Sequence, residues 1–217
     1  MTRALVVLLA PVVLAQARAL RRRTPELEDP PGARRGGAGA PRVLVVGDST
    51  AVGMGVDTLE EALPARLAAR LGARWSIAGR SGWTATEVLR GVGSDAAAPA
   101  DVLVLLVGWN DAMRVRSGRA FARALEGLIV AARAERVVIV APPEFGRYPV
   151  LPQPLRAALG AVANGLTRRA ARIAEAHGAA LVPGFDGSHV ARDGFHPDAS
   201  GYDAMAERIA AELSTRR

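Results

Sequence analysis

The sequence predicts an α/β fold in which helices cover both faces of a parallel β-sheet. From Arg42 onward, short apolar runs alternate with longer segments of helical period, and this alternation is typical of strands joined by crossover helices. Most of the runs are rich in Val, Leu and Ile, as expected for strands that are buried on both faces. Because such connections are right-handed, helices should stack on each side of the sheet, giving a three-layer α/β/α sandwich.

The predicted parallel sheet contains about five strands, each bounded by Gly, Pro or charged residues. The strands are expected at residues 43–46, 75–78, 102–107, 137–141 and 180–182. The helices are expected at residues 58–71, 84–91, 119–135, 154–177 and 200–213. In the last helix, Met205, Ile209 and Leu213 recur at every fourth position, so we expect this apolar stripe to face the sheet.

The chain is organised as one domain behind an N-terminal leader. A length of 217 residues exceeds what one core needs but is less than two ordinary domains take. Half of the residues are hydrophobic and 23% are charged, which is the balance of a globular chain. We therefore predict a single domain at residues 42–217, preceded by a hydrophobic segment at 1–23. Residues 24–41 are rich in Pro and Gly and have no apolar period, so they are predicted to form a flexible linker.

The hydrophobic segment has features of both a membrane anchor and a signal peptide. Residues 4–17 are almost uninterruptedly apolar. This run is short for a membrane span, which usually takes about 20 residues. Residues 15–17 (AQA) fit the small-x-small rule of signal cleavage, whereas the arginines at 18 and 21–23 favour a cytoplasmic flank and an uncleaved anchor. We expect association with a membrane through this segment, with the side left open and with secretion after cleavage as the alternative.

The composition argues against several classes of protein. Residues 1–42 hold eight arginines against three carboxylates, so most of the net charge of +7 belongs to the leader and the domain is nearly neutral. Aromatic residues make up 4% of the chain, which leaves few stacking surfaces for bases, and we expect no nucleic-acid partner. The sequence contains no Cys, which excludes disulfides, thiolate catalysis and Cys-based zinc sites.

Three of the predicted strands are followed by loops that carry candidate functional residues, since reactive groups gather at the carboxyl ends of parallel strands. The first loop, GDST, places an exposed Ser49 hydroxyl at a strand-to-helix turn. In the second, GRSG, Gly82 lets the backbone approach a ligand closely. In the third, GWND, the Asn110 amide can donate to an oxyanion. Each motif alone is also compatible with an ordinary turn.

A fourth loop, near the C-terminus, supplies a histidine with a carboxylate. The sequence contains two Asp-x-x-His pairs, Asp186 with His189 and Asp193 with His196, and a carboxylate at this spacing can orient the imidazole. The second pair is favoured because Pro197 follows it and the last helix begins a few residues later, whereas His189 is expected in a solvent-facing loop. The three histidines of the chain lack a ligand spacing, so no metal site is predicted.

Together the four loops resemble the SGNH hydrolase family of GDSL-like lipases and esterases, whose name records one residue from each of four sequence blocks. The blocks GDST, GRSG, GWND and DGFHP occur here in the family's order across residues 43–217. They supply Ser49, Gly82, Asn110 and His196. Four ordered matches are far more specific than any one alone. Thr50 in place of the common Leu, and Trp109 in a position that is often small, are expected to change the pocket rather than the mechanism.

The resemblance implies a flavodoxin-like SGNH hydrolase fold and a serine hydrolase that acts on ester bonds. In the implied Ser-His-Asp triad, Ser49 attacks a carbonyl carbon, His196 takes the Ser49 proton and Asp193 holds the imidazole. The implied oxyanion hole consists of the backbone N–H groups of Ser49 and Gly82 and the side-chain amide of Asn110. No cofactor or metal is implied. Asp48 and Asp111 are expected to bond nearby backbone N–H groups rather than to act as a second acid and base.

The implied substrate is a small-molecule or lipid ester, either a carboxylic ester or a thioester. The hydrophobic leader favours lipid, for instance a lysophospholipid. Acyl transfer to a sugar or alcohol uses the same triad and stays open. A catalytically silent domain that binds an acyl or glycan ligand also stays open, although the intact set of Ser49, Asp193 and His196 argues against it. The sequence leaves the acyl-chain length and the oligomeric state open.

Overall fold

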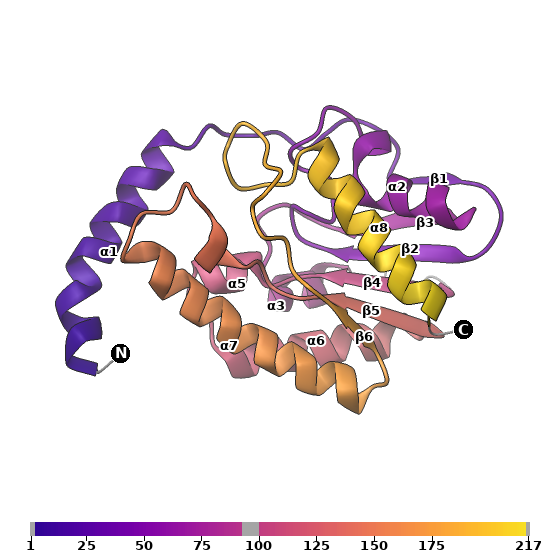
Figure 1. The fold of residues 1–217 in the computed structure, drawn as a ribbon. Helices are drawn as coiled ribbons and strands as arrows, with labels where there is room; N and C mark the ends of the chain where they lie inside the picture. The colour runs from indigo at the N-terminus through magenta and orange to yellow at the C-terminus, as the bar shows by residue number, and fades with distance from the viewer. Residues whose placement is uncertain (1–2, 93–99, 216–217) are drawn as a thin grey trace.

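The computed structural model, which describes residues 3–92 and 100–215, contains a six-stranded sheet with helices on both faces (Figure 1). The strands are β1 (Arg35–Gly37), β2 (Arg42–Gly47), β3 (Arg74–Gly79), β4 (Val102–Leu106), β5 (Arg136–Val140) and β6 (Ala180–Val182). Their order is β1-β3-β2-β4-β5-β6, and all neighbours are parallel except β1 and β3. The five predicted strands are confirmed, and β1 is an additional edge strand. Parts of the predicted segments 1–23 and 42–217, namely residues 1–2, 93–99 and 216–217, lie outside the described residues.

Helices cover the sheet in two outer layers. The helices of the described residues are α1 (Arg3–Arg23), α2 (Leu63–Leu71), α3 (Ala85–Gly91), α5 (Trp109–Met113), α6 (Gly118–Ala132), α7 (Leu155–Ala176) and α8 (Ala199–Thr215), with 3₁₀ turns η1 (Leu59–Glu61) and η2 (Phe145–Arg147). Helix α1 lies beside the sandwich and does not cover the sheet (Figure 1). On one face α2 packs against α8, and on the other α6 packs between α3 and α7 (Figure 1). This arrangement confirms the predicted three-layer α/β/α sandwich.

Local sequence signals explain where two of these helices begin. The helix predicted at 58–71 is divided into η1 and α2, because Pro64 lies in the first turn of α2 and has no N–H to continue a helix from the preceding turn. Thr84 precedes α3 as its N-cap. Its backbone N–H donates to Glu87 Oε2 at 2.7 Å, and its hydroxyl accepts the Glu87 N–H at 3.4 Å. This reciprocal pair is a capping box.

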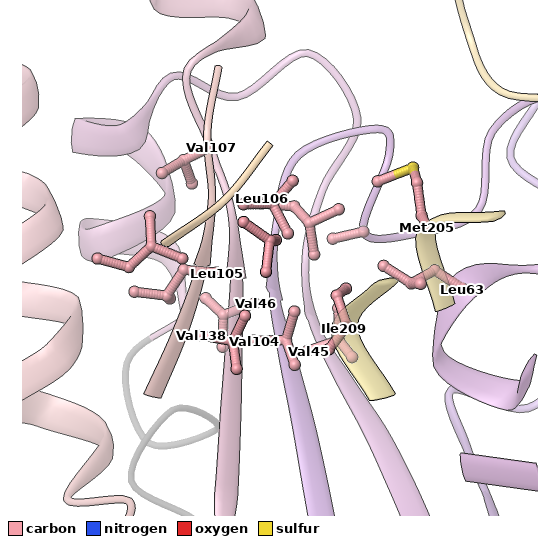
Figure 2. Packing of buried hydrophobic residues seen from close by; sticks show 14 of the residues in the cluster. Val45, Val46, Leu63, Val104, Leu105, Leu106, Val107, Val138, Met205 and Ile209 are labelled. Carbon is pink, nitrogen blue, oxygen red and sulfur yellow. The ribbon is translucent and has the colours of Figure 1, made fainter. Parts of the chain in front are cut away.

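The hydrophobic core lies on both faces of the sheet. Every residue of β4 is buried, which follows from its VLVLL sequence and from the helices on each side. Figure 2 shows Leu63 of α2 with Met205 and Ile209 of α8 on one side of the strands, and Leu105 of β4 on the other. Leu213 is buried together with Met205 and Ile209, so the predicted stripe of α8 does face the core.

Strand β1 lies inside the segment 24–41, where the sequence predicts a flexible linker. Its three residues, Arg-Gly-Gly, pair with β3, and they lack the apolar alternation that signals a strand. A Cβ on Gly36 would come within 3.1 Å of the Trp75 ring, so the glycine allows the chain to lie directly against this indole. Part of the segment is therefore ordered by main-chain pairing with β3, which its composition does not predict.

Helix α1 packs against the start of α7. Its residues Val13 and Leu20 are partly buried against the core. Gln16 Oε1 accepts the backbone N–H of Leu155 at 3.1 Å, and Gln16 Nε2 donates to the carbonyl oxygen of Gln153 at 2.7 Å. The first of these bonds satisfies one of the free N–H groups at the N-terminus of α7. No helix within residues 3–92 and 100–215 is both long enough and apolar enough to cross a membrane.

Replacing Gly47 with Ala is expected to destabilise the protein strongly. Gly47 pairs with Gly79 of β3 and Leu106 of β4, and a Cβ here would collide with the Leu106 carbonyl oxygen. Because backbone atoms cannot move aside as a flexible side chain can, we expect a loss on the order of 3 kcal/mol in the free energy of unfolding. Gly146→Ala is the matched control, since no atom lies within 4 Å of the added methyl group. Urea melts of the two variants check this, and equal stability would contradict the close approach.

Candidate active site

Three candidate residues meet at one edge of the sheet because β2, β3 and β4 end in register. Gly47, the last residue of β2, is paired with Gly79 at the end of β3, and β4 ends on its other side. Ser49 follows β2 by two residues, Gly82 follows β3 by three, and Asn110 lies in the first turn of α5 just beyond β4. The carboxyl ends of parallel strands thus bring three of the predicted loops together.

Ser49, His196 and Asp193 form one chain of hydrogen bonds at this edge. Ser49 Oγ lies 2.9 Å from His196 Nε2, and His196 Nδ1 lies 2.5 Å from Asp193 Oδ2. The expectation of an exposed Ser49 hydroxyl is wrong, because the residue is only 4% exposed. The loop between β6 and α8 lays the imidazole directly against it, so the hydroxyl is covered by its own hydrogen-bond partner.

The surroundings of Asp193 favour its carboxylate form. Oδ1 accepts the backbone N–H groups of Phe195 at 2.9 Å and of His196 at 3.1 Å. Burial opposes ionisation, but the side-chain hydrogen bond with His196, its charge and these N–H groups together hold the pKa of Asp193 below its usual range. An ionised Asp193 accepts a hydrogen bond from Nδ1–H, which leaves the lone pair on Nε2 directed at Ser49 Oγ.

Within the part of the chain that the structure describes, each of the three expected oxyanion donors keeps an N–H group that no other acceptor takes up. Among the described residues, no hydrogen bond uses the backbone N–H of Ser49 or Gly82. Asn110 Nδ2 donates one of its two hydrogens to the Trp83 carbonyl oxygen at 3.0 Å, which orients the amide and leaves the second hydrogen available. Gly82 has a φ of +81°, which glycine adopts without strain, and its carbonyl oxygen accepts from Arg114 Nη2 at 2.7 Å. Such donors are suited to a developing oxyanion.

Comparison with known proteins identifies the family. Residues 45–204 match the GDSL-like Lipase/Acylhydrolase family. The chain belongs to this family. Similar solved structures include TesA, with 25% identity, a TM-score of 0.67 and coverage of 81% of this chain and 99% of that chain. The lipase/acylhydrolase from Enterococcus faecalis is 24% identical, with a TM-score of 0.62 and coverage of 82% and 97%. A carbohydrate acetylesterase family member from Sinorhizobium meliloti is 20% identical, with a TM-score of 0.65 and coverage of 81% and 98%.

These comparisons confirm the resemblance that the four sequence blocks carry. They also establish that the GDSL-like protein is an ester-hydrolysing enzyme. No curated protein matches the sequence.

In this GDSL-like hydrolase, Trp109 forms a wall behind the imidazole of His196. The two rings are stacked, with centroids 5.5 Å apart and planes inclined by 21°. Phe145, Tyr148 and Phe195 meet the indole edge-on, with centroids at 4.8, 5.7 and 5.9 Å. This packing fixes the tilt of the imidazole. The sequence identified Trp109 only as a bulky residue, because its ring partners come from distant loops.

The other Asp-x-x-His pair, Asp186 with His189, makes no hydrogen bond between its two side chains among the described residues. His189 is exposed, and Asp186 Oδ1 instead accepts the Ser188 backbone N–H at 3.1 Å. Asp186 Oδ2 lies 3.7 Å from Arg147 Nη2, so this carboxylate is directed away from an imidazole partner. Within residues 3–92 and 100–215, no group of three or more His, Asp or Glu side chains could hold a metal ion.

Asp48 and Asp111 hold the shapes of their loops, as the sequence predicts. Asp111 Oδ2 accepts the Ala85 backbone N–H at 2.9 Å, and Asp48 Oδ1 accepts the Thr50 N–H at 3.2 Å. Asp48 Oδ2 is a buried oxygen that has no hydrogen-bond partner among the described residues. Burial raises the pKa of Asp48 to about 7, against the opposing effects of the Thr50 N–H and the charge of His196. The fold therefore favours the neutral form of this carboxyl.

Changing Asp48 to Asn is expected to improve stability relative to the wild-type protein as the pH rises. The neutral Asp48 contributes stability that is complete below its ordinary pKa of 3.8 and is lost as the pH rises through about 7. Asn cannot ionise, so the Tm of the variant minus that of the wild type should increase between about pH 4.5 and pH 8. Thermal melts across this range provide the measurement, and a difference that stays constant would contradict the assignment.

The opposite trend is expected for Asp101→Asn, which serves as the control. The side-chain hydrogen bond from Arg42, with further help from its backbone N–H and its charge, lowers the pKa of Asp101 to about 2. This ion pair is partly exposed, with Nη2 and Oδ1 2.8 Å apart. A depressed pKa contributes stability that is present above the ordinary value of 3.8 and is lost as the pH falls toward about 2. The Tm of Asp101→Asn should therefore fall short of the wild-type Tm by less as the pH drops from 3.8 toward about 2.

Proposed function

We propose that the protein is a serine esterase that forms an acyl-enzyme on Ser49. The observation that carries the proposal is the 2.9 Å contact between Ser49 Oγ and His196 Nε2, with Nδ1 of the same ring held by Asp193. In the first step, Oγ attacks the carbonyl carbon of an ester while Nε2 takes the hydroxyl proton. Asp193 then stabilises the imidazolium, and Trp109 holds the tilt of the ring through stacking.

The negative charge that develops on the substrate carbonyl oxygen would be received by three donors. These are the backbone N–H groups of Ser49 and Gly82 and the second amide hydrogen of Asn110. When the tetrahedral intermediate collapses, the bond from carbon to the alcohol oxygen breaks and His196 Nε2 returns its proton to the leaving alcohol. A water molecule, deprotonated by the same Nε2, then attacks the acyl-enzyme, and the acid is released as Ser49 recovers its proton.

The substrate proposed is a small-molecule or lipid ester, with a lysophospholipid as the lipid candidate. A panel of p-nitrophenyl esters from acetate upward, together with lysophospholipid and acetylated xylan, identifies the acyl and alcohol preferences. The same assays with an added alcohol acceptor separate hydrolysis from acyl transfer, because a transferase yields a new ester where a hydrolase yields the free acid. Absence of any turnover or acyl-enzyme would contradict the proposal.

The triad assignment predicts which histidine variant loses activity. Ser49→Ala and His196→Ala are expected to remove nearly all hydrolysis of p-nitrophenyl acetate, because the nucleophile or its base is gone. Asp193→Asn should lose a smaller but large share, since Asn cannot hold the Nδ1–H tautomer as a carboxylate does. His189→Ala is the matched control and should remain within a few-fold of wild type. An inactive His189→Ala variant, or a Ser49→Ala variant with wild-type turnover, would contradict the mechanism.

We also propose that residues 1–23 attach the enzyme to a membrane, with secretion after cleavage as the alternative. The apolar run at 4–17 supports attachment, and Val12 and Leu14 are 45% and 55% exposed on α1, where they are free to enter lipid.

The full-length chain is expected to sediment with membranes and to be released by detergent. The double variant Val12→Asp, Leu14→Asp should move to the soluble fraction. A wild-type chain found only in the soluble fraction would contradict the proposal, and a shortened chain outside the cell would favour secretion.

A further inference from the structure

We infer that residues 29–37, the N-terminal brace, position the loop that carries the Gly82 N–H for catalysis, with Asp29 and Arg34 as positioning residues. The inference rests on the proposed function, because it concerns one of the oxyanion donors of the same site. It also gives a positioning role to a segment that the composition predicts to be a linker. The brace runs along the edge of the sheet next to β3, and the loop in question, residues 80–83, follows directly from that strand.

The brace contacts the Gly82 loop at two points that precede Gly82. Arg34 Nη1 donates to the carbonyl oxygen of Gly79 at 2.7 Å. Ser81 Oγ donates to Asp29 Oδ1. One contact therefore fixes the peptide at the start of the loop, and the other fixes the residue adjacent to Gly82. Asp29 and Arg34 are both exposed, so these two contacts lie at the surface of the protein.

The brace is itself anchored to the body of the enzyme. The carbonyl oxygen of Arg34 accepts the Ile77 N–H at 2.9 Å, and β1 continues the pairing with β3. The carbonyl oxygen of Pro31 accepts the Leu59 N–H at 3.2 Å. Pro30 is buried, and it packs against Gly53, where a Cβ would lie 3.3 Å from the proline ring and 2.6 Å from Ala62. Gly53 belongs to the turn that follows Ser49, so one segment touches both the Ser49 loop and the Gly82 loop.

The Gly82 loop has few bonds of its own to hold its shape. Its internal and neighbouring backbone bonds, from Arg80 N–H to Gly47 and from Trp83 N–H to Arg80, are both 3.3 Å long. On the side of α5, Asn110 and Arg114 hold the carbonyl oxygens of Trp83 and Gly82. The brace supplies the opposing contacts. An oxyanion donor must lie within about 0.5 Å of its working position, so a loop held from one side only is expected to stabilise the transition state less well.

The test uses the full-length chain and compares kcat and KM for p-nitrophenyl acetate. Asp29→Ala and Ser81→Ala each remove one partner of the same bond, and Arg34→Met removes the donor to Gly79. Each is expected to lower kcat by about three- to tenfold with little change in KM, because the affected donor acts mainly on the transition state. The double variant Asp29→Ala, Ser81→Ala should be no slower than the slower single variant, since both remove one interaction.

Conservative variants and a neighbouring carboxylate separate positioning from a general structural effect. Asp29→Asn and Arg34→Lys keep an acceptor and a donor, so they are expected to recover at least half of the wild-type kcat. Glu28→Ala, an exposed carboxylate of the adjoining segment, should match the wild type. All variants are assayed well below their Tm. Ser81→Ala leaves the brace itself intact, so it still tests the contact if a brace variant unfolds.

The results distinguish a failure of the positioning role from a failure of the proposed esterase function. If Ser49→Ala is inactive while Asp29→Ala, Ser81→Ala and Arg34→Met keep the wild-type kcat, the brace has no positioning role and only this inference is overturned. The same conclusion follows if these variants raise KM at unchanged kcat, or if the losses of Asp29→Ala and Ser81→Ala multiply in the double variant. If Ser49→Ala itself retains wild-type turnover, the proposed function fails first.

Discussion

The position of β2 between β3 and β4 sets the geometry on which the site depends. At the end of β2, the backbone of Gly47 lies so close to Leu106 on one side and Gly79 on the other that a side chain at either glycine would collide with main-chain oxygen. In this register the three strands end almost together. The loops bearing Ser49 and Gly82 therefore start from neighbouring points, and short connections suffice to bring their polar groups into one site.

Three buried carboxyl groups lie around this edge, and each has a different set of hydrogen-bond partners. Asp193 receives two backbone N–H groups and the imidazole of His196, which together outweigh the cost of burial and favour its ionised form. Asp111 is buried as well, and burial raises its pKa although the Ala85 N–H bonds to it. Asp48 has one oxygen without a partner and favours the neutral form most strongly. Asp193, the carboxylate that we propose stabilises the imidazolium, is thus the one of the three whose hydrogen bonds keep it charged.

Features that depend on a local sequence pattern could be predicted from the sequence. Features that depend on contacts between distant parts of the chain could not. Apolar runs predicted β2 to β6, and four ordered motifs predicted that Ser49 and His196 would meet although 147 positions separate them. Strand β1 could not be predicted, because Arg-Gly-Gly pairs through backbone groups that every residue possesses. The stacking of Trp109 on His196 and the raised pKa of Asp48 depend on which side chains the fold assembles around them, and no spacing in the chain records that.

The imidazole of His196 is restrained in three directions by three separate parts of the chain. Ser49 in the loop after β2 and Asp193 in the loop before α8 hold its two nitrogens and so fix its rotation within the ring plane. Trp109 at the start of α5 lies against its face and fixes its tilt. Because none of these restraints is local to His196 except that of Asp193, the orientation of the ring depends on the sheet and on the segment leading into α8 together. The orientation of this imidazole is therefore a property of the completed fold rather than of any one motif.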